Sequence, residues 1–116
     1  MRWANLLIQQ SDLVLAVGAR LSLQQTGFNW QQFAPLADVI QVDIDPHELG
    51  KSHPSKTLTL RMSAESLLPE LLTKVVTNPL WSQWFDFRDQ LRSLLPLNDP
   101  RNETRPGFIN PYFFAM

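Results

Sequence analysis

Residues 13–17 (LVLAV) form a continuous apolar run that ends at Gly18. A run that is apolar at every position is typical of a strand in a parallel sheet, because such a sheet can be covered on both faces. Residues 39–44 form a second strand-like run, and residues 57–60 form a third and weaker one. Since strand-like and helix-like segments alternate along residues 13–76, the chain is predicted to contain a parallel α/β sheet.

Helix signals flank these runs. Residues 2–10 carry an apolar face at helical spacing. Asp45 is expected to cap a short helix that starts at Pro46 and ends at Gly50, with Glu48 three residues after the cap, as in a capping box. The predicted fold class is therefore α/β, with a partial, parallel, Rossmann-like sheet flanked by helices.

The helix after the third strand has two candidate caps. Apolar residues recur at helical spacing through residues 67–76. If Ser63 is the cap, Pro69 falls inside the helix and removes a backbone hydrogen bond. If Ser66 is the cap, Pro69 lies in the first turn and is tolerated. The sequence leaves both alternatives open.

The remaining segments do not belong to the sheet. Residues 80–95 predict a separate amphipathic helix, and the polar, Pro-rich residues 96–109 are typical of an interdomain linker. Residues 110–116 begin a helix, with Asn110 as its cap and Pro111 at its first position. Three strands leave a sheet face and a strand edge without partners, so we expect a truncated fragment of a larger protein.

Size and composition exclude several classes of function. The 116 residues suffice for one small domain, and the net charge of −1 gives no footprint for nucleic acid or an anionic membrane. Without cysteine, disulfides and thiol catalysis are excluded. No apolar run is long enough to span a bilayer, and no signal peptide is recognisable, so a cytoplasmic location is predicted.

Two strand ends carry residues that could contact a ligand. In open parallel sheets, ligands lie beyond the carboxyl ends of the strands. After the first strand, Gly18 would let a ligand approach the backbone, and Arg20 offers a planar fork for phosphate; a tight turn with a solvated arginine is the alternative. At the end of the second strand, Asp43 occupies the place of a ribose contact, or it only caps the next helix.

Other candidates are weaker. The sequence has no G-x-G-x-x-G fingerprint, and Gly50 and Pro54 break any helical metal geometry between His47 and His53, which we expect at the surface. The sequence contains no convincing Ser-His-Asp set and no convincing catalytic carboxylate pair. We therefore predict no catalytic residue and no metal ligand in this chain.

Three sequence stretches together resemble one family. They are "ANLLIQQSDLVLAVGARLSLQQTG", "FAPLADVIQVDIDPHELGK" and "INPY". They resemble the central domain of thiamine diphosphate-dependent enzymes, in particular those of the acetolactate synthase type. The resemblance makes residues 1–79 the second half of that central domain and residues 110–116 the start of the cofactor-binding domain that follows.

The resemblance implies what the complete enzyme does. Such enzymes act on 2-keto acids by carboligation or decarboxylation, with thiamine diphosphate and Mg²⁺ held between their first and third domains. They are homodimers or homotetramers. Their central domain carries no catalytic residue and binds FAD, an adenine nucleotide such as ADP, or nothing. This chain is accordingly expected to be inactive alone.

The family's contacts to FAD or ADP are carried over by position. They fall on Gly18, Ala19, Arg20, Leu21 and Ser22, on Asp43 and Ile44, and on Ser63 and Ala64. The chain departs from the FAD-binding pattern at residues 22–24, where acetolactate synthases have acidic residues and an arginine, and at residues 63–64, where an Asp is usual. Two other readings stay open: a stand-alone FAD- or ADP-binding module, and an interaction module that docks through apolar surfaces such as the Trp81, Trp84 and Phe85 face.

Overall fold

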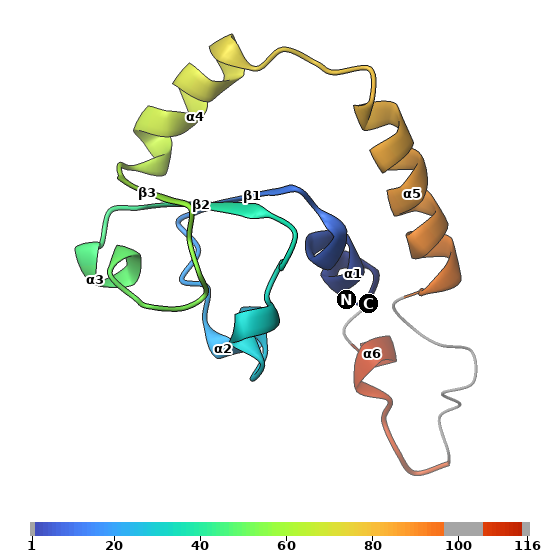
Figure 1. Cartoon of the computed structure of the whole chain (residues 1–116). Coiled ribbons are helices and arrows are strands. Elements are labelled where there is room, and N and C mark those ends of the chain that lie inside the picture. The colour runs from blue at the N-terminus through green and yellow to red at the C-terminus, as the bar shows by residue number, and fades with distance from the viewer. Residues whose placement is uncertain (1, 97–105, 115–116) are drawn as a thin grey trace. The chain divides into compact units, whose positions relative to one another are not determined.

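The computed structural model of the chain describes residues 2–96 and 106–114, without the side chain of Tyr112 (Figure 1). Its elements in chain order are α1 (Arg2–Gln10), β1 (Leu13–Val17), α2 (Leu23–Thr26), the 3₁₀ helix η1 (Trp30–Gln32), β2 (Asp38–Asp43), α3 (Pro46–Leu49), β3 (Leu58–Arg61), α4 (Ala64–Lys74), α5 (Trp81–Leu94) and α6 (Pro111–Phe114). Most of the predicted linker, residues 97–105, lies outside the described residues.

The chain divides into two compact units. One is Ile8–Thr77, which contains the sheet, and the other combines Met1–Leu7 with Asn78–Met116. The division into segments 1–79, 80–95, 96–109 and 110–116 stays a prediction.

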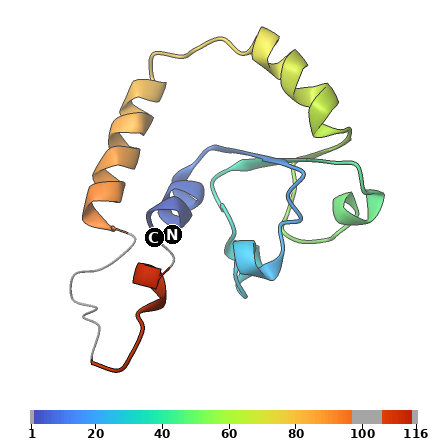
Figure 2. The ribbon, with the colours of Figure 1, turned by 180° about the vertical axis from the view of Figure 1, so that it is seen from behind.

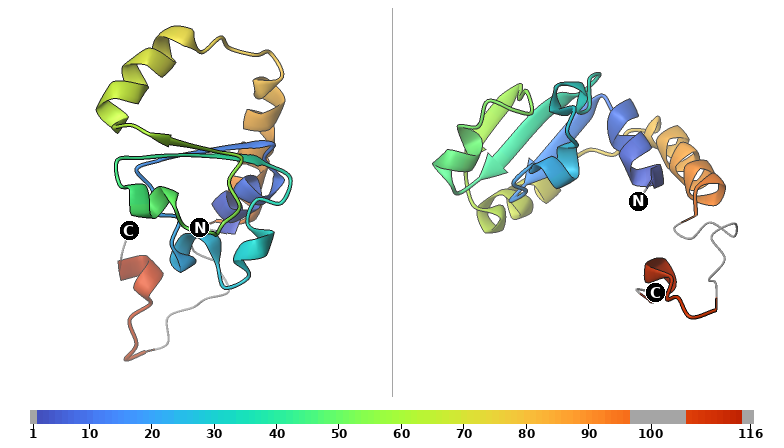
Figure 3. Two further views of the ribbon diagram at one scale, coloured as in Figure 1. Left: turned by 60° about the vertical axis from the view of Figure 1, so that its left-hand side comes forward. Right: turned by 90° about the horizontal axis from the view of Figure 1, so that it is seen from below.

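The sheet has three parallel strands in the order β1-β2-β3. In the register, Val17 lies opposite Val42, and Asp43 lies opposite Arg61. Figure 3 shows the three arrows side by side, with β2 in the middle. The predicted parallel α/β sheet is therefore confirmed.

Two strands are displaced from the apolar runs that predicted them. β2 spans Asp38–Asp43 instead of residues 39–44, and β3 spans Leu58–Arg61 instead of residues 57–60. Asp38 joins β2 because it lies opposite Leu13 and its N–H donates to the Asp12 carbonyl. Pairing with the neighbouring strand, which the apolar pattern does not report, sets where each strand begins and ends.

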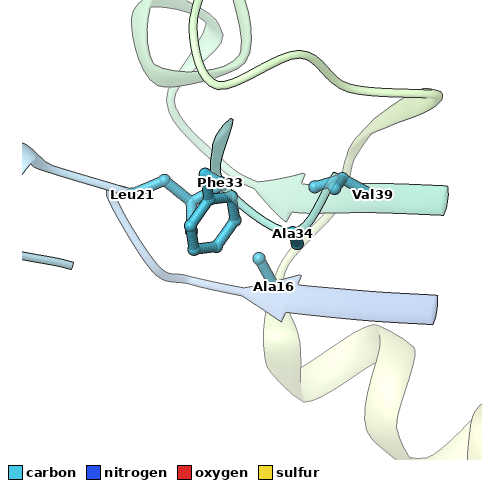
Figure 4. Packing of buried hydrophobic residues seen from close by; sticks show 5 residues of the cluster. All are labelled: Ala16, Leu21, Phe33, Ala34 and Val39. Carbon is cyan, nitrogen blue, oxygen red and sulfur yellow. The ribbon is translucent and has the colours of Figure 1, made fainter. Parts of the chain in front are cut away.

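The main cluster of buried apolar side chains lies on one face of the sheet. α2 and α3 lie on one side of the strands, and α4 lies on the other (Figures 1 and 2). A cluster of buried apolar side chains fills the α2 side (Figure 4), and it consists of Ala16, Leu21, Phe33, Ala34 and Val39. On the opposite face Leu13 and Leu15 are 54% and 40% exposed. The expected shortage of partners for a three-stranded sheet thus appears on the α4 side.

The helix α3 forms as predicted, but its cap works differently. Asp45 precedes the helix, and its carboxylate accepts a hydrogen bond of 2.8 Å from the His47 N–H. Glu48 was expected to complete a capping box by accepting the Asp45 N–H. That N–H donates instead to Asp43 Oδ1, at 3.0 Å, and Glu48 pairs with Lys51.

The structure decides between the two caps of α4. Ser63 is the N-cap, and its hydroxyl accepts a hydrogen bond of 3.2 Å from the Ser66 N–H. Pro69 consequently stands inside the helix, where it removes one backbone hydrogen bond. No residue of α4, all of which the structure describes, is buried. The Ser66 alternative is wrong, and α4 accommodates the proline without ending.

In the second unit, α5 is the predicted amphipathic helix. The Arg92 guanidinium lies 5.5 Å from the centre of the Trp3 ring, and Arg2 Nη2 donates to the Pro96 carbonyl at 3.2 Å. These contacts join α5 to the start of α1. The short helix α6 begins at Pro111, directly after Asn110, as predicted. Across residues 2–96 and 106–114, every helix is too short or too polar to cross a lipid bilayer.

Candidate functional site

The segments that follow the three strands meet at one edge of the sheet. We call this the carboxyl edge, and it consists of Gly18–Ser22, Asp43–Ile44 and Ser63–Ala64. The Gly18 N–H donates to the Val42 carbonyl at 2.9 Å, and the Met62 N–H donates to the Asp43 carbonyl at 3.2 Å. The structure therefore brings the three segments that contain the nine predicted contact residues to adjacent strand ends; that they bind a cofactor stays a prediction.

Gly18 leaves open space at the end of β1. Its φ angle is +58°, in the left-handed region that side chains disfavour. A Cβ built on Gly18 would meet no atom within 4 Å, so the space beside the backbone is free. Gly18 itself is exposed. A ligand can therefore approach the main chain at this point.

The rest of this segment is held down by contacts on both sides of Arg20. The Gln41 side chain donates from Nε2 to the Ala19 carbonyl at 3.1 Å, and Lys51 Nζ donates to the Arg20 carbonyl at 3.3 Å. Leu21 is 8% exposed and belongs to the core, with an unusual φ of +46°. The backbone of Arg20 is thus fixed between two anchored residues.

The Arg20 side chain itself is exposed. In the part of the chain that the structure describes, no hydrogen-bonding or ionic partner is found for its guanidinium. Ser22, two residues on, starts α2, and its N–H donates to the Gln25 side chain at 3.1 Å. The loop is therefore followed by a short helix, α2, that the sequence did not reveal. Because the Arg20 side chain is exposed, it is available to an anion.

Asp43 is buried and already has a structural task. Asp43 is 8% exposed, and its Oδ1 accepts a hydrogen bond from the Asp45 N–H. Its backbone carbonyl accepts a hydrogen bond from the N–H of Met62, the residue that follows β3. Asp43 does not itself cap the next helix, which Asp45 caps, but it accepts the N–H of that capping residue. The Asp43 carboxylate retains further acceptor sites on its two oxygens for the predicted ribose contact. Ile44, the next residue, is 66% exposed.

Ser63 and Ala64 reach the carboxyl edge through β3. The Ser63 hydroxyl is occupied as the α4 cap and lies 2.9 Å from the Ser66 hydroxyl. Ala64 is the exposed first residue of α4. At these two positions the chain offers small side chains and no carboxylate.

The sequence analysis did not predict the contact of Gln41 with the Ala19 carbonyl or that of His53 with Trp30. Gln41 lies within an otherwise apolar run, and that interruption was the available signal. His53, expected at the surface, is half-buried and stacks on Trp30, with ring centres 4.3 Å apart at 27°. His47 is exposed, as predicted. Within the described residues no group of three or more His, Asp or Glu side chains could hold a metal ion.

Three charged side chains, Glu48, Lys51 and Lys56, lie close to the loop that contains Arg20. The Lys51 ammonium pairs with Glu48, and Lys56 Nζ donates to the Lys51 carbonyl. Burial lowers the pKa of Lys56, and the nearby Lys51 ammonium lowers it further, while Glu48 acts in the opposite direction. The Glu48–Lys51–Lys56 group therefore braces the backbone of residues 20 and 51 and adds positive charge near the carboxyl edge.

Comparisons with known proteins all match this chain to a single enzyme family. The family described as "Thiamine pyrophosphate enzyme, central domain" matches residues 1–71. The acetolactate synthase of Mycobacterium leprae is 32% identical over 112 residues, which cover 91% of this chain and 17% of that protein. The acetolactate synthase isozyme 2 large subunit of Escherichia coli is 43% identical over 68 residues, 59% of this chain and 12% of that protein. The chain thus spans less than a fifth of the length of these relatives.

Proposed function

Because this chain belongs to the thiamine pyrophosphate enzyme family, as a central domain with acetolactate synthase-like sequence, we propose that its carboxyl edge binds the adenine-nucleotide portion of FAD or ADP. The observation that carries the proposal is the pairing of the Gly18 and Asp43 strand ends, with an exposed arginine between anchored neighbours. Adjacent carboxyl ends of parallel strands are where open α/β sheets bind nucleotides.

The described residues fit such a ligand in part. Gly18 leaves room beside the main chain, and the exposed Arg20 can form paired hydrogen bonds with a phosphate. Asp43 fits less well, because it is only 8% exposed and its carboxylate already accepts the Asp45 N–H. The absence of an acidic residue at Ser63 or Ala64 weakens the case for FAD.

For the whole protein we propose an enzyme that uses thiamine diphosphate and Mg²⁺ on 2-keto acids, as a homodimer or homotetramer in the cytoplasm. Its relatives are named acetolactate synthases, which supports carboligation or decarboxylation as the reaction class. When bound, thiamine diphosphate supplies the carbanion chemistry of that class. The residues of this chain would bind a nucleotide and support the structure of the enzyme. The full chain alone should not turn over pyruvate with thiamine diphosphate and Mg²⁺.

Isothermal titration of the full chain with ADP, FAD and NAD tests this function. We expect heat with ADP, and weaker binding in the Arg20→Gln variant. Arg92→Gln, the same charge change on α5, is the control and should bind ADP like the parent chain. Absence of heat with both ADP and FAD would remove the proposed nucleotide site.

A second candidate function, protein interaction without catalysis, is favoured by one observation. The α4 side of the sheet exposes a set of large apolar side chains, namely Leu13, Leu15, Leu58 and Leu60. Exposed apolar patches mark interaction surfaces. On this proposal the chain self-associates in sedimentation velocity; a sharp monomer that unfolds cooperatively would argue against it.

A further inference from the structure

The most deeply buried polar side chain of the sheet is Gln41. It stands in the middle strand, between Ala16 of β1 and Thr59 of β3, and is 1% exposed. Burying an amide is unfavourable unless it finds hydrogen-bond partners. The partner here is the Ala19 carbonyl, 3.1 Å from Gln41 Nε2, in a segment 22 residues away in sequence.

This contact decides the course of the chain after β1. Gly18 continues the β1–β2 ladder through its bond to Val42. The next carbonyl, that of Ala19, accepts the Gln41 amide, while the side chain of Arg20 is exposed and Leu21 enters the core. Leu21 adopts its positive φ directly after this pair of anchored residues, and α-left conformations persist only where the surroundings enforce them.

We infer that Gln41 is a positioning residue: its amide holds the Ala19 carbonyl against the sheet and thereby presents Arg20 at the carboxyl edge. An apolar residue at position 41 would suit the strand and the core equally well. It would leave the Ala19 carbonyl without this donor and free the loop from β2. The Lys51 contact to the next carbonyl is a weaker support, because the Lys51 side chain is 38% exposed.

The part of the inference that concerns Arg20 and a nucleotide rests on the proposed function. The conformation of residues 18–22 can be measured without any ligand. Two variants of the full chain serve this purpose. Gln41→Met keeps length and volume and removes the donor. In Gln41→Glu, the ionised carboxyl cannot donate to the Ala19 carbonyl, whereas the protonated carboxyl can. Burial raises the pKa of such a carboxyl, so acidification should restore the contact.

The primary readout is NMR of the ligand-free chain. In Gln41→Met we expect the Ala19 carbonyl carbon and the amides of residues 18–22 to shift, while those of β3 stay in place. In Gln41→Glu the same shifts should appear at alkaline pH, above the raised pKa of the buried carboxyl, and should revert on acidification toward the signals of the unsubstituted chain at the same pH. Unchanged loop signals in Gln41→Met, or no reversion in Gln41→Glu, would overturn the inference. A merely space-filling Gln41 predicts no such pH reversal.

Two further measurements separate the possible failures. In the unsubstituted chain, the Gln41 side-chain amide protons should exchange more slowly than those of the exposed Gln24 and Gln31; equal rates would contradict a bonded amide even if a variant does not fold. ADP affinity should fall about fivefold in Gln41→Met, the factor that one net hydrogen bond contributes, and less in Lys51→Met. If the unsubstituted chain binds neither ADP nor FAD, the proposed function fails, while the loop signals still decide the role of Gln41.

Discussion

The backbone N–H of Gly18 donates a hydrogen bond to the carbonyl oxygen of Val42 across 2.9 Å. This bond extends the β1–β2 ladder one residue beyond the end of β1 and brings the loop after β1 beside Asp43. The shared edge on which the nucleotide proposal depends follows from it. Residues that are 24 or 25 positions apart in sequence become neighbours at a single point of the sheet.

Replacing Gly18 should destabilise the sheet unit through the backbone alone. Its φ of +58° is unfavourable for a side chain, while a Cβ at this position would touch nothing. We expect Gly18→Ala to lower the free energy of unfolding by about 1 kcal/mol, measured by urea denaturation of the full chain. Gly18→Asn is the matched control and should lose less, because Asn enters this region more readily. Equal stability of the Ala variant and the parent chain would contradict the assigned φ.

The cap of α3 should be measurable by itself. Asp45 accepts the His47 N–H at 2.8 Å, and Asp45→Ala removes this acceptor. The expected loss is about 1 kcal/mol of unfolding free energy. Asp45→Ser retains a capping oxygen and should recover most of the loss. An Ala variant as stable as the Ser variant would show that the cap contributes nothing.

Pro69 should limit the stability of α4. Inside the helix it removes one backbone hydrogen bond and crowds the preceding turn. We expect Pro69→Ala to increase amide protection in residues 70–74, with a gain below about 3 kcal/mol, because the unfolded chain also gains freedom. Leu72→Ala, at an exposed position of the same helix, is the control and should leave protection nearly unchanged. Lower protection in the Pro69 variant would contradict the helix as described.

The Arg88–Asp89 pair on α5 gives a pH signature. The hydrogen bonds that Arg88 donates to the Asp89 carboxylate, at 2.9 and 3.0 Å, hold the pKa of Asp89 below its ordinary value of 3.8, and the charges of Arg88 and Arg92 act in the same direction. Because the folded-state pKa is depressed, the stabilisation is present above pH 3.8 and is lost as the pH falls through the folded pKa. Both groups are exposed, so the effect on stability should be small.

This prediction is checked by following the Asp89 carboxyl carbon in an NMR titration. Its midpoint should lie below 3.8 in the parent chain and return toward that value in Arg88→Gln. A Gln90→Ala variant, which leaves the pair intact, should titrate like the parent. A midpoint that ignores the Arg88 substitution would contradict the assigned cause.

Local signals predicted several elements well. The apolar run of residues 13–17 became β1, and the Asp45-Pro46 pair marked the start of α3 at the correct residue. The cap of α3 depends on interactions within a few residues, and the apolar run of β1 reflects burial on both faces of a strand, so a sequence pattern records both. Glu48 shows the limit of such reasoning, because its spacing suits a capping box, but Lys51 claims its carboxylate and Asp43 takes its place at the Asp45 N–H.

The sequence by itself determined the three strands to within one residue and their alternation with helices, since these follow from periodicity and backbone preference. Only the tertiary structure decided that Gln41 reaches the Ala19 carbonyl, that Asp43 already supports the next helix, and which face of the sheet is covered. Those outcomes depend on which groups from distant segments come within hydrogen-bonding distance. Strand pairing sets that distance, and no single segment carries the information.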